Sequence, residues 1–180
     1  MSRSNPLKKK RKCANSTLLM FGEGLGEEVF FKHLKRLYAR DGGVSVTIKN
    51  GKGGSADGIV MSAVRCTGAF DRRVVVLDND KSRKEMGLAR SLAQKNGIEL
   101  LENTPCLEAI LLSILRDGKS FSNKTAPWCK KEFKSGYLDE RKKTDIREYE
   151  KVFPKELLDQ RCIDVDELEQ VVSLMRVKND

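Results

Sequence analysis

Two short runs of apolar residues constrain the fold of this chain most strongly. The runs Leu18-Leu19-Met20-Phe21 and Val74-Val75-Val76-Leu77 are continuous rather than alternating, and each leads into a polar turn and a helical pattern. Continuous apolar runs of this length are typical of parallel strands that are buried on both faces. They predict an α/β protein in which buried strands alternate with helices.

The rest of the chain continues this series of strands and helices. Apolar residues recur at helical spacing from Val29 to Tyr38, and Val44 to Ile48 alternate as in a strand. Further helices are predicted over residues 57–66, with Ser55 or Asp57 as the cap, and over 83–95, 107–115 and 164–177, with a strand over 98–101. The series predicts a Rossmann-like, doubly wound and mostly parallel sheet with helices on both faces, plus a C-terminal helical appendage.

The length of 180 residues suits one main domain. We expect a basic disordered tail over residues 1–16, the α/β domain over 17–137 and a helical extension over 138–180, with 117–143 polar and mixed.

No apolar stretch is long enough for a membrane span and the N-terminus lacks a signal-peptide core, so a cytoplasmic protein without a membrane partner is expected. The five cysteines form no CxxC pair and His33 is the only histidine, which argues against a zinc site and a disulfide framework.

The first twelve residues hold a strongly basic segment. The formal net charge is +9, and six basic residues in this segment, with no acidic residue among them, supply most of the excess. Such a run suits binding to a phosphate backbone through the release of counterions, although a solvated tail that only keeps the protein soluble fits equally well. The candidate nucleic-acid contacts in this segment are Lys8, Lys9, Lys10, Arg11 and Lys12.

Acidic residues follow the two apolar runs directly. Glu23 follows the first run, and Asp78 and Asp80 follow the second. Ligands of open α/β sheets bind where the strands end. Two like charges about 4 Å apart repel by roughly 4 kcal/mol at an effective dielectric constant of 20, so a cluster of three acids is hard to explain without a cation, and a divalent metal is the simplest one. Oxygen ligands without a nearby histidine or thiolate favour Mg²⁺ or Mn²⁺ over zinc.

Other residues near these acids have two interpretations each. Glu27, four residues after Glu23, would lie on the same side of a helix start, but taken alone it fits a residue that complements the helix dipole. Asp80 fits a metal ligand and a chance acid equally well. Glycines on both sides of Glu23 allow a sharp turn and leave space for a bulky anionic ligand. Lys52, in a glycine loop, could reach a substrate phosphate or have no fixed contact, and Lys81 could pair with an aspartate.

The motifs and their order resemble the Toprim family. Phe21-Gly22-Glu23-Gly24 is similar to the first Toprim motif, and Val76-Leu77-Asp78-Asn79-Asp80 to its DxD motif. The Gly51-Lys52-Gly53 loop and Asn103-Thr104-Pro105-Cys106-Leu107-Glu108 resemble features of the RloB-like group, which together with the OLD nucleases acts in bacterial defence. The resemblance covers roughly residues 18 to 137.

The resemblance implies a metal-dependent nuclease that acts against phages or mobile elements. Glu23 would be a metal ligand or general acid/base, Asp78 and Asp80 would be metal ligands, and Glu27 and Glu108 would be candidate ligands of a second ion. The implied partners are nucleic acid, a partner ATPase or another defence protein, and a second copy of the chain. The alternative is a noncatalytic Toprim-like module that binds nucleic acid or a partner ATPase. A lysine or arginine lodged permanently between Glu23 and the aspartates would favour that alternative.

Overall fold

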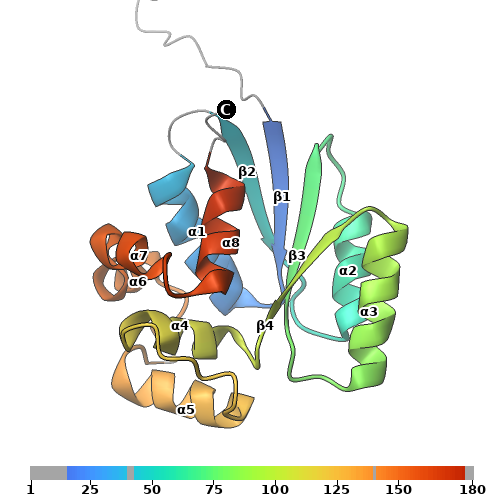
Figure 1. The fold of residues 1–180 in the computed structure, drawn as a ribbon. Helices are drawn as coiled ribbons and strands as arrows, with labels where there is room; N and C mark the ends of the chain where they lie inside the picture. The colour runs from blue at the N-terminus through green and yellow to red at the C-terminus, as the bar shows by residue number, and fades with distance from the viewer. Residues whose placement is uncertain (1–15, 40–42, 140, 177–180) are drawn as a thin grey trace, which may run out of the picture.

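Four parallel strands form the centre of the protein. In the computed structural model, which describes residues 16–39, 43–139 and 141–176, these strands are β1 (Ser16–Gly22), β2 (Val44–Asn50), β3 (Arg72–Asp78) and β4 (Glu99–Asn103). Their order in the sheet is β2-β1-β3-β4 (Figure 1). The two continuous apolar runs are the two central strands, β1 and β3, as the sequence predicts.

The helices cover both faces of this sheet. They are α1 (Leu25–Tyr38), α2 (Ala56–Val64), α3 (Arg83–Lys95), α4 (Leu107–Leu115), α5 (Ala126–Gly136), α6 (Ile146–Val152), α7 (Lys155–Arg161) and α8 (Asp166–Met175). The predicted α/β, doubly wound architecture is confirmed. The pattern recovers α3 and α4 with their exact bounds, and Ser55 rather than Asp57 caps α2 by accepting a hydrogen bond from the Gly58 N–H.

Alternate residues of each central strand point to two different cores. On one face, Leu19 and Leu77 belong to a cluster that includes residues of α2 and α3, the two helices that cover this face in Figure 1. On the other face, Met20 and Val76 belong to a larger cluster that includes α1 and the helices α4 to α8. The C-terminal helices therefore share one core with the sheet, and Tyr149 of α6 is 2% exposed within it.

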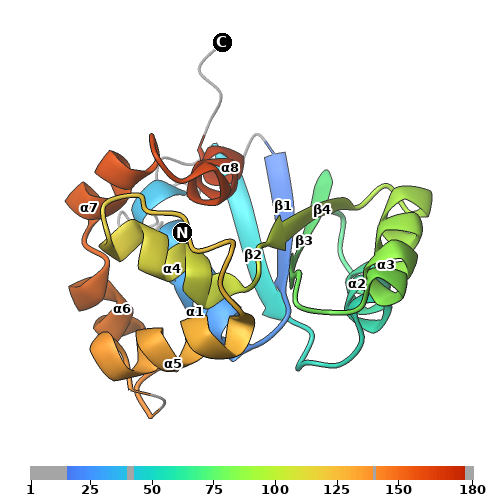
Figure 2. The ribbon, with the colours of Figure 1, turned by 60° about the horizontal axis from the view of Figure 1, so that its bottom comes forward.

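Helix α5 lies in the stretch that the sequence indicates only as polar and mixed. Thr125 caps it by accepting a hydrogen bond from the Trp128 N–H, and Cys129 and Phe133 are its buried contacts with the core. The helix packs on α4, and both lie at the end of the sheet where the strands end (Figures 1 and 2). This position brings the lysines of α5 to the strand ends.

The basic residues at positions 8–12 lie outside the described residues. Within the described part of the chain, no helix combines the length and apolar character needed to cross a membrane.

Candidate functional site

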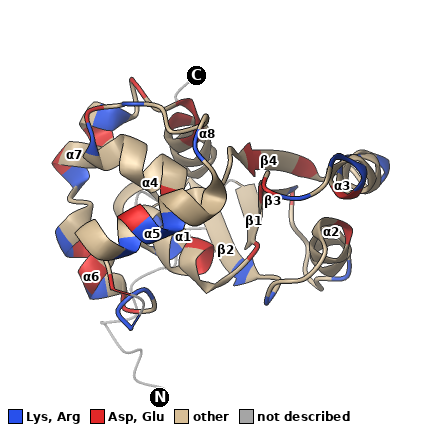
Figure 3. Cartoon of the chain, turned by 90° about the horizontal axis from the view of Figure 1, so that it is seen from below, with Lys and Arg blue, Asp and Glu red and all other residues tan. Residues whose placement is uncertain are grey.

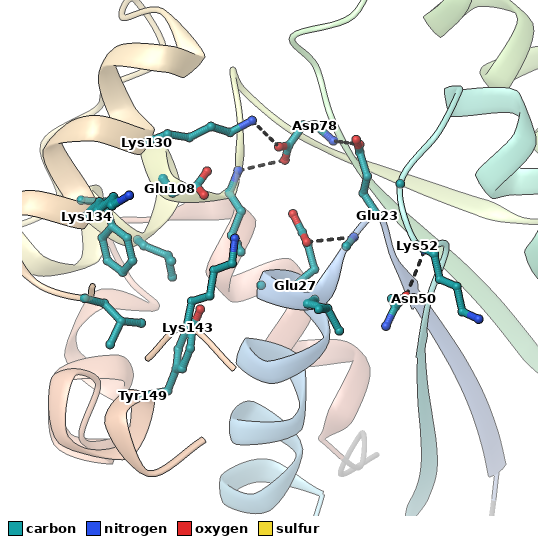
Figure 4. A pocket seen from close by; sticks show the side chains of 18 residues that line it. Glu23, Glu27, Asn50, Lys52, Asp78, Glu108, Lys130, Lys134, Lys143 and Tyr149 are labelled. Atoms are coloured by element: carbon teal, nitrogen blue, oxygen red, sulfur yellow. Dashed lines mark hydrogen bonds and ion pairs between the residues drawn. The ribbon is translucent and has the colours of Figure 1, made fainter. Parts of the chain in front are cut away.

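Glu23 and Asp78 lie side by side at the ends of the two central strands. Strands β1 and β3 are paired, with Phe21 opposite Val75, so their carboxyl ends reach the same edge of the sheet. One carboxylate oxygen of Glu23, Oε2, lies 3.4 Å from the backbone nitrogen of Asp78, which donates to it. The sequence-predicted proximity of these two acids is therefore observed (Figure 4).

The first turn of α4 fixes the side chain of Asp78. The Leu107 N–H donates to Asp78 Oδ1 at 2.9 Å, and the Asn103 amide donates to the same oxygen at 3.4 Å. The N-terminus of a helix has unpaired N–H groups and a partial positive charge, so it stabilises a carboxylate placed there. These bonds hold the side chain of Asp78, which is only 5% exposed, in one orientation.

Glu27 projects from α1 into the same site and also caps that helix. Its Oε2 accepts a hydrogen bond from the Gly24 N–H at 3.0 Å, and the residue is 8% exposed. A Cβ atom at Gly22 would lie 2.6 Å from the Cβ of Glu27. The missing side chain at Gly22 thus leaves space for Glu27 and not for a bulky ligand, which corrects the sequence-based interpretation of this glycine.

Glu108 and Cys106 come from the start of α4. The Glu108 Oε2 atom is buried and has no hydrogen-bond partner among the described residues. One potential ligand atom from each of Asp78, Cys106 and Glu108 lies within 4.8 Å of the others. Cys106 thus places a sulfur atom beside the two carboxylates, which the sequence did not predict.

The charges of this cluster are unfavourable without a cation. Burial, followed by the negative charges of Glu27 and Glu108, raises the pKa of Asp78 to about 8, although Lys130 opposes the shift. Burial also raises the pKa of Glu27, and Glu108 and Glu23 add to that shift. Burial, followed by the negative charges of Glu108 and Asp78, raises the pKa of the Cys106 thiol, which keeps it protonated at neutral pH. The oxygen atoms are thus the available ligands, and they suit Mg²⁺ or Mn²⁺.

Two lysines pair with the acids. Lys81 Nζ lies 2.9 Å from Glu23 Oε1, so Lys81 pairs with Glu23. The sequence-based prediction that it pairs with an aspartate is wrong. Lys130 Nζ lies 3.7 Å from Asp78 Oδ2 and 3.4 Å from Asp80 Oδ2, which places the two aspartates on the same side. Neither lysine forms an ion pair with both Glu23 and an aspartate, and the side chain of Lys130 is 46% exposed. Lys130 can therefore move toward solvent when a cation binds.

A cavity of about 790 Å³ opens over this cluster. Its lining includes Glu23, Glu27, Asp78 and Glu108, and Figure 4 shows these four side chains gathered at one end. Asp80 is not part of the lining, and its side chain is 30% exposed at the rim beside Lys130.

Lysines line the same cavity from several elements. Lys52 lies in its wall, but in Figure 4 its amino group points away from the carboxylates. Lys130 and Lys134 of α5, together with Lys143 from the turn before α6, line the other side. Seen from the strand ends, basic residues of α5 lie near the acidic first turn of α1 (Figure 3).

Sequence reasoning missed the lysines of α5 and Cys106. The spacing of Ala126, Cys129 and Phe133 is an apolar helical face that could have predicted α5, and Lys130 and Lys134 then fall one turn apart. That signal gives no indication of which sheet edge the helix covers. No match was found in a scan against protein-family models, in a search of curated proteins or in a search of solved structures. The resemblance to the Toprim family stays a prediction.

Proposed function

We propose that this protein is a Mg²⁺- or Mn²⁺-dependent phosphodiesterase that hydrolyses nucleic acid. The resemblance to RloB-like nucleases extends the proposal to a cytoplasmic enzyme of defence against foreign genetic elements. Nucleic acid is the proposed substrate, and an ATPase or another defence protein and a second copy of the chain are candidate partners. Lys8 to Lys12, with Lys52, are proposed contacts to the phosphate backbone.

The convergence of four carboxylates, of which Glu27 and Asp78 are buried, supports this proposal most strongly. Glu23, Glu27, Asp78 and Glu108 line one end of the cavity, and Glu108 Oε2 is buried without a partner. A buried acceptor without a hydrogen bond costs about 1–3 kcal/mol, and more if it is charged. A cation that takes Glu108 Oε2 as a ligand removes that cost and the repulsion among the acids. The donor set therefore fits the proposed ions.

The roles of the residues follow from their positions. Glu23, Asp78 and Glu108, joined by Glu27 and by Asp80 at the rim, would hold one or two ions. When bound, such ions neutralise the nonbridging phosphate oxygens and lower the pKa of bound water. Glu23 would be either a metal ligand or the general acid/base, and Lys81, whose Nζ donates to Glu23 Oε1, holds its carboxylate in place. Lys130 is positioned to contact a phosphate that lies near Asp78 and Asp80.

An assay with purified full-length protein tests the proposal. Plasmid, single-stranded DNA and tRNA are incubated with Mg²⁺, with Mn²⁺ and with EDTA, using wild-type protein and the Glu23→Gln variant. Cleavage is expected with a divalent metal only, and Glu23→Gln should lower its rate by about a hundredfold or more, since a lost outer-shell partner alone costs 10–100-fold. Glu169→Gln, an exposed acid of α8, is the matched control and should cleave at the wild-type rate. Cleavage that persists in EDTA or in Glu23→Gln contradicts the proposal.

The ion pairs of Lys81 and Lys130 favour the second candidate, a noncatalytic nucleic-acid-binding or ATPase-binding module. In such a module the lysines neutralise the acids permanently and no metal is needed. Isothermal titration of the protein with Mg²⁺ and Mn²⁺ separates the two candidates. Tight nucleic-acid binding without metal binding or cleavage would establish the module.

A further inference from the structure

The cavity has two ends with different chemistry. The acidic end holds Asp78 and Glu108, while Leu111, Phe133, Leu138 and Tyr149, core residues that are 1–5% exposed, form the apolar floor further along. In Figure 4, Tyr149 lies at the opposite end of the lining from Asp78. A ligand that fills the cavity must therefore offer an apolar part as well as an anionic group that binds a cation.

Lysines lie between these two ends. Lys130 and Lys134 occupy successive turns of α5 and line the cavity, and Lys143 lines it beside Tyr149 in Figure 4. Lys131, the neighbour of Lys130 on α5, is exposed and does not line the cavity. The lysine side of α5 that faces the cavity is thus suited to an anionic group between the acidic and the apolar ends.

A nucleotide combines these properties. Its phosphate suits the lysines and a metal held by the acids, and its base offers an apolar face that packs on aromatic and aliphatic side chains. The volume of about 790 Å³ lies within the range of small-ligand pockets, about 300–1,000 Å³. A base that is paired and stacked in a duplex cannot enter such a pocket, because its faces and its pairing edge are already occupied.

We propose that this cavity holds one unpaired nucleotide, with its base at the apolar end and its phosphate between the lysines and the acidic end. The substrate is therefore single-stranded nucleic acid or an unpaired loop or end. The part of this inference that concerns hydrolysis rests on the proposed function. The part that concerns binding of the base does not depend on it.

Binding of small ligands to the full-length protein tests the base-binding part. AMP and ribose 5-phosphate are titrated calorimetrically in the presence of Mg²⁺, so the two ligands differ only in the base. AMP is expected to bind at least about tenfold more tightly than ribose 5-phosphate, because one stacked or buried base contributes about that much affinity. Lys134→Ala should weaken AMP binding at least about threefold, and Lys131→Ala should leave it unchanged. Equal affinity for the two ligands overturns the inference, and altering the ligand rather than the protein excludes misfolding as the cause.

Cleavage of matched oligonucleotides tests the unpaired-substrate part. A single strand and the duplex of the same sequence are compared, and the single strand is expected to be cut at least about tenfold faster. Equal rates overturn the inference while leaving the proposed hydrolase intact. Tighter binding of AMP than of ribose 5-phosphate, with no cleavage of either oligonucleotide, supports the base pocket and contradicts the proposed hydrolase.

Discussion

The two sides of the cavity differ in how they are built. The acidic side consists of residues at the ends of central strands, such as Glu23 and Asp78, joined by the first turns of α1 and α4. The basic side consists of Lys130 and Lys134 on α5, a helix whose main packing partner is α4. The acidic side is thus fixed by the sheet, whereas the basic side depends on the docking of one amphipathic helix.

This difference assigns the two sides different tasks. Asp78 is buried and hydrogen-bonded to α4, so its position is fixed before any ligand binds. Lys130 has a long, partly exposed side chain, so its amino group can leave the two aspartates and form an ion pair with a phosphate instead. We infer that the acidic side holds the metal and the basic side holds the substrate.

The largest expected effect comes from breaking the acidic side at Asp78→Asn. The amide keeps an oxygen acceptor for the Leu107 N–H but removes a charged metal ligand. Metal-dependent cleavage should fall by about a hundredfold or more, with Mg²⁺ binding weakened in parallel. Cleavage rates over a range of Mg²⁺ concentrations, with Glu169→Gln as the control, measure this. A cleavage rate within threefold of wild type would show that Asp78 is not a ligand of the metal.

The basic side should behave differently when Lys130 is replaced by alanine. The loss of a phosphate contact should lower the cleavage rate by about tenfold. At the same time the aspartates lose a competing ammonium, so the half-saturating Mg²⁺ concentration should stay the same or fall. Lys131→Ala on the same helix is the matched control. A rise in the half-saturating Mg²⁺ concentration would show that Lys130 organises the acidic side, and the assignment of separate tasks would then be wrong.

The same division explains what could be predicted from the sequence. Strand ends are predictable because a continuous apolar run fixes both the strand and the residue that follows it, and this identified Glu23, Asp78 and Asp80. The orphaned oxygen of Glu108 and the proximity of the Cys106 thiol depend on how the β4–α4 connection turns. The contact of Lys130 with the aspartates depends on tertiary packing of α5, for which local spacing carries no signal.

The pH dependence of stability provides a smaller effect that is specific to the acidic side. The pKa of Asp78 is raised to about 8 in the folded protein, against about 3.9 for an unfolded aspartate. Between these values the folded state binds the extra proton, so the free energy of unfolding without metal should decrease as pH rises from about 4 to about 8. The contribution of one proton has a limiting slope of about 1.4 kcal/mol per pH unit.

Urea unfolding of the wild type and of Asp78→Asn in EDTA, at intervals between pH 5 and pH 8, isolates this contribution. The difference in unfolding free energy between the two proteins should change with pH in favour of the variant as pH rises. A difference that is independent of pH shows that Asp78 is ionised throughout and that Lys130 neutralises it.

The smallest effect is expected for Cys106→Ser, which tests whether the sulfur belongs to the acidic side. Burial and the neighbouring carboxylates raise the pKa of this thiol, so it carries no charge to offer Mg²⁺ at neutral pH. Mg²⁺-dependent cleavage should therefore stay within about threefold of wild type, as should that of Cys66→Ser, the matched control outside the cavity. Circular dichroism melting confirms that both variants are folded before rates are compared. A loss as large as that of Asp78→Asn would make Cys106 a ligand, and because a thiolate prefers softer ions, the resident metal would then be zinc rather than magnesium or manganese.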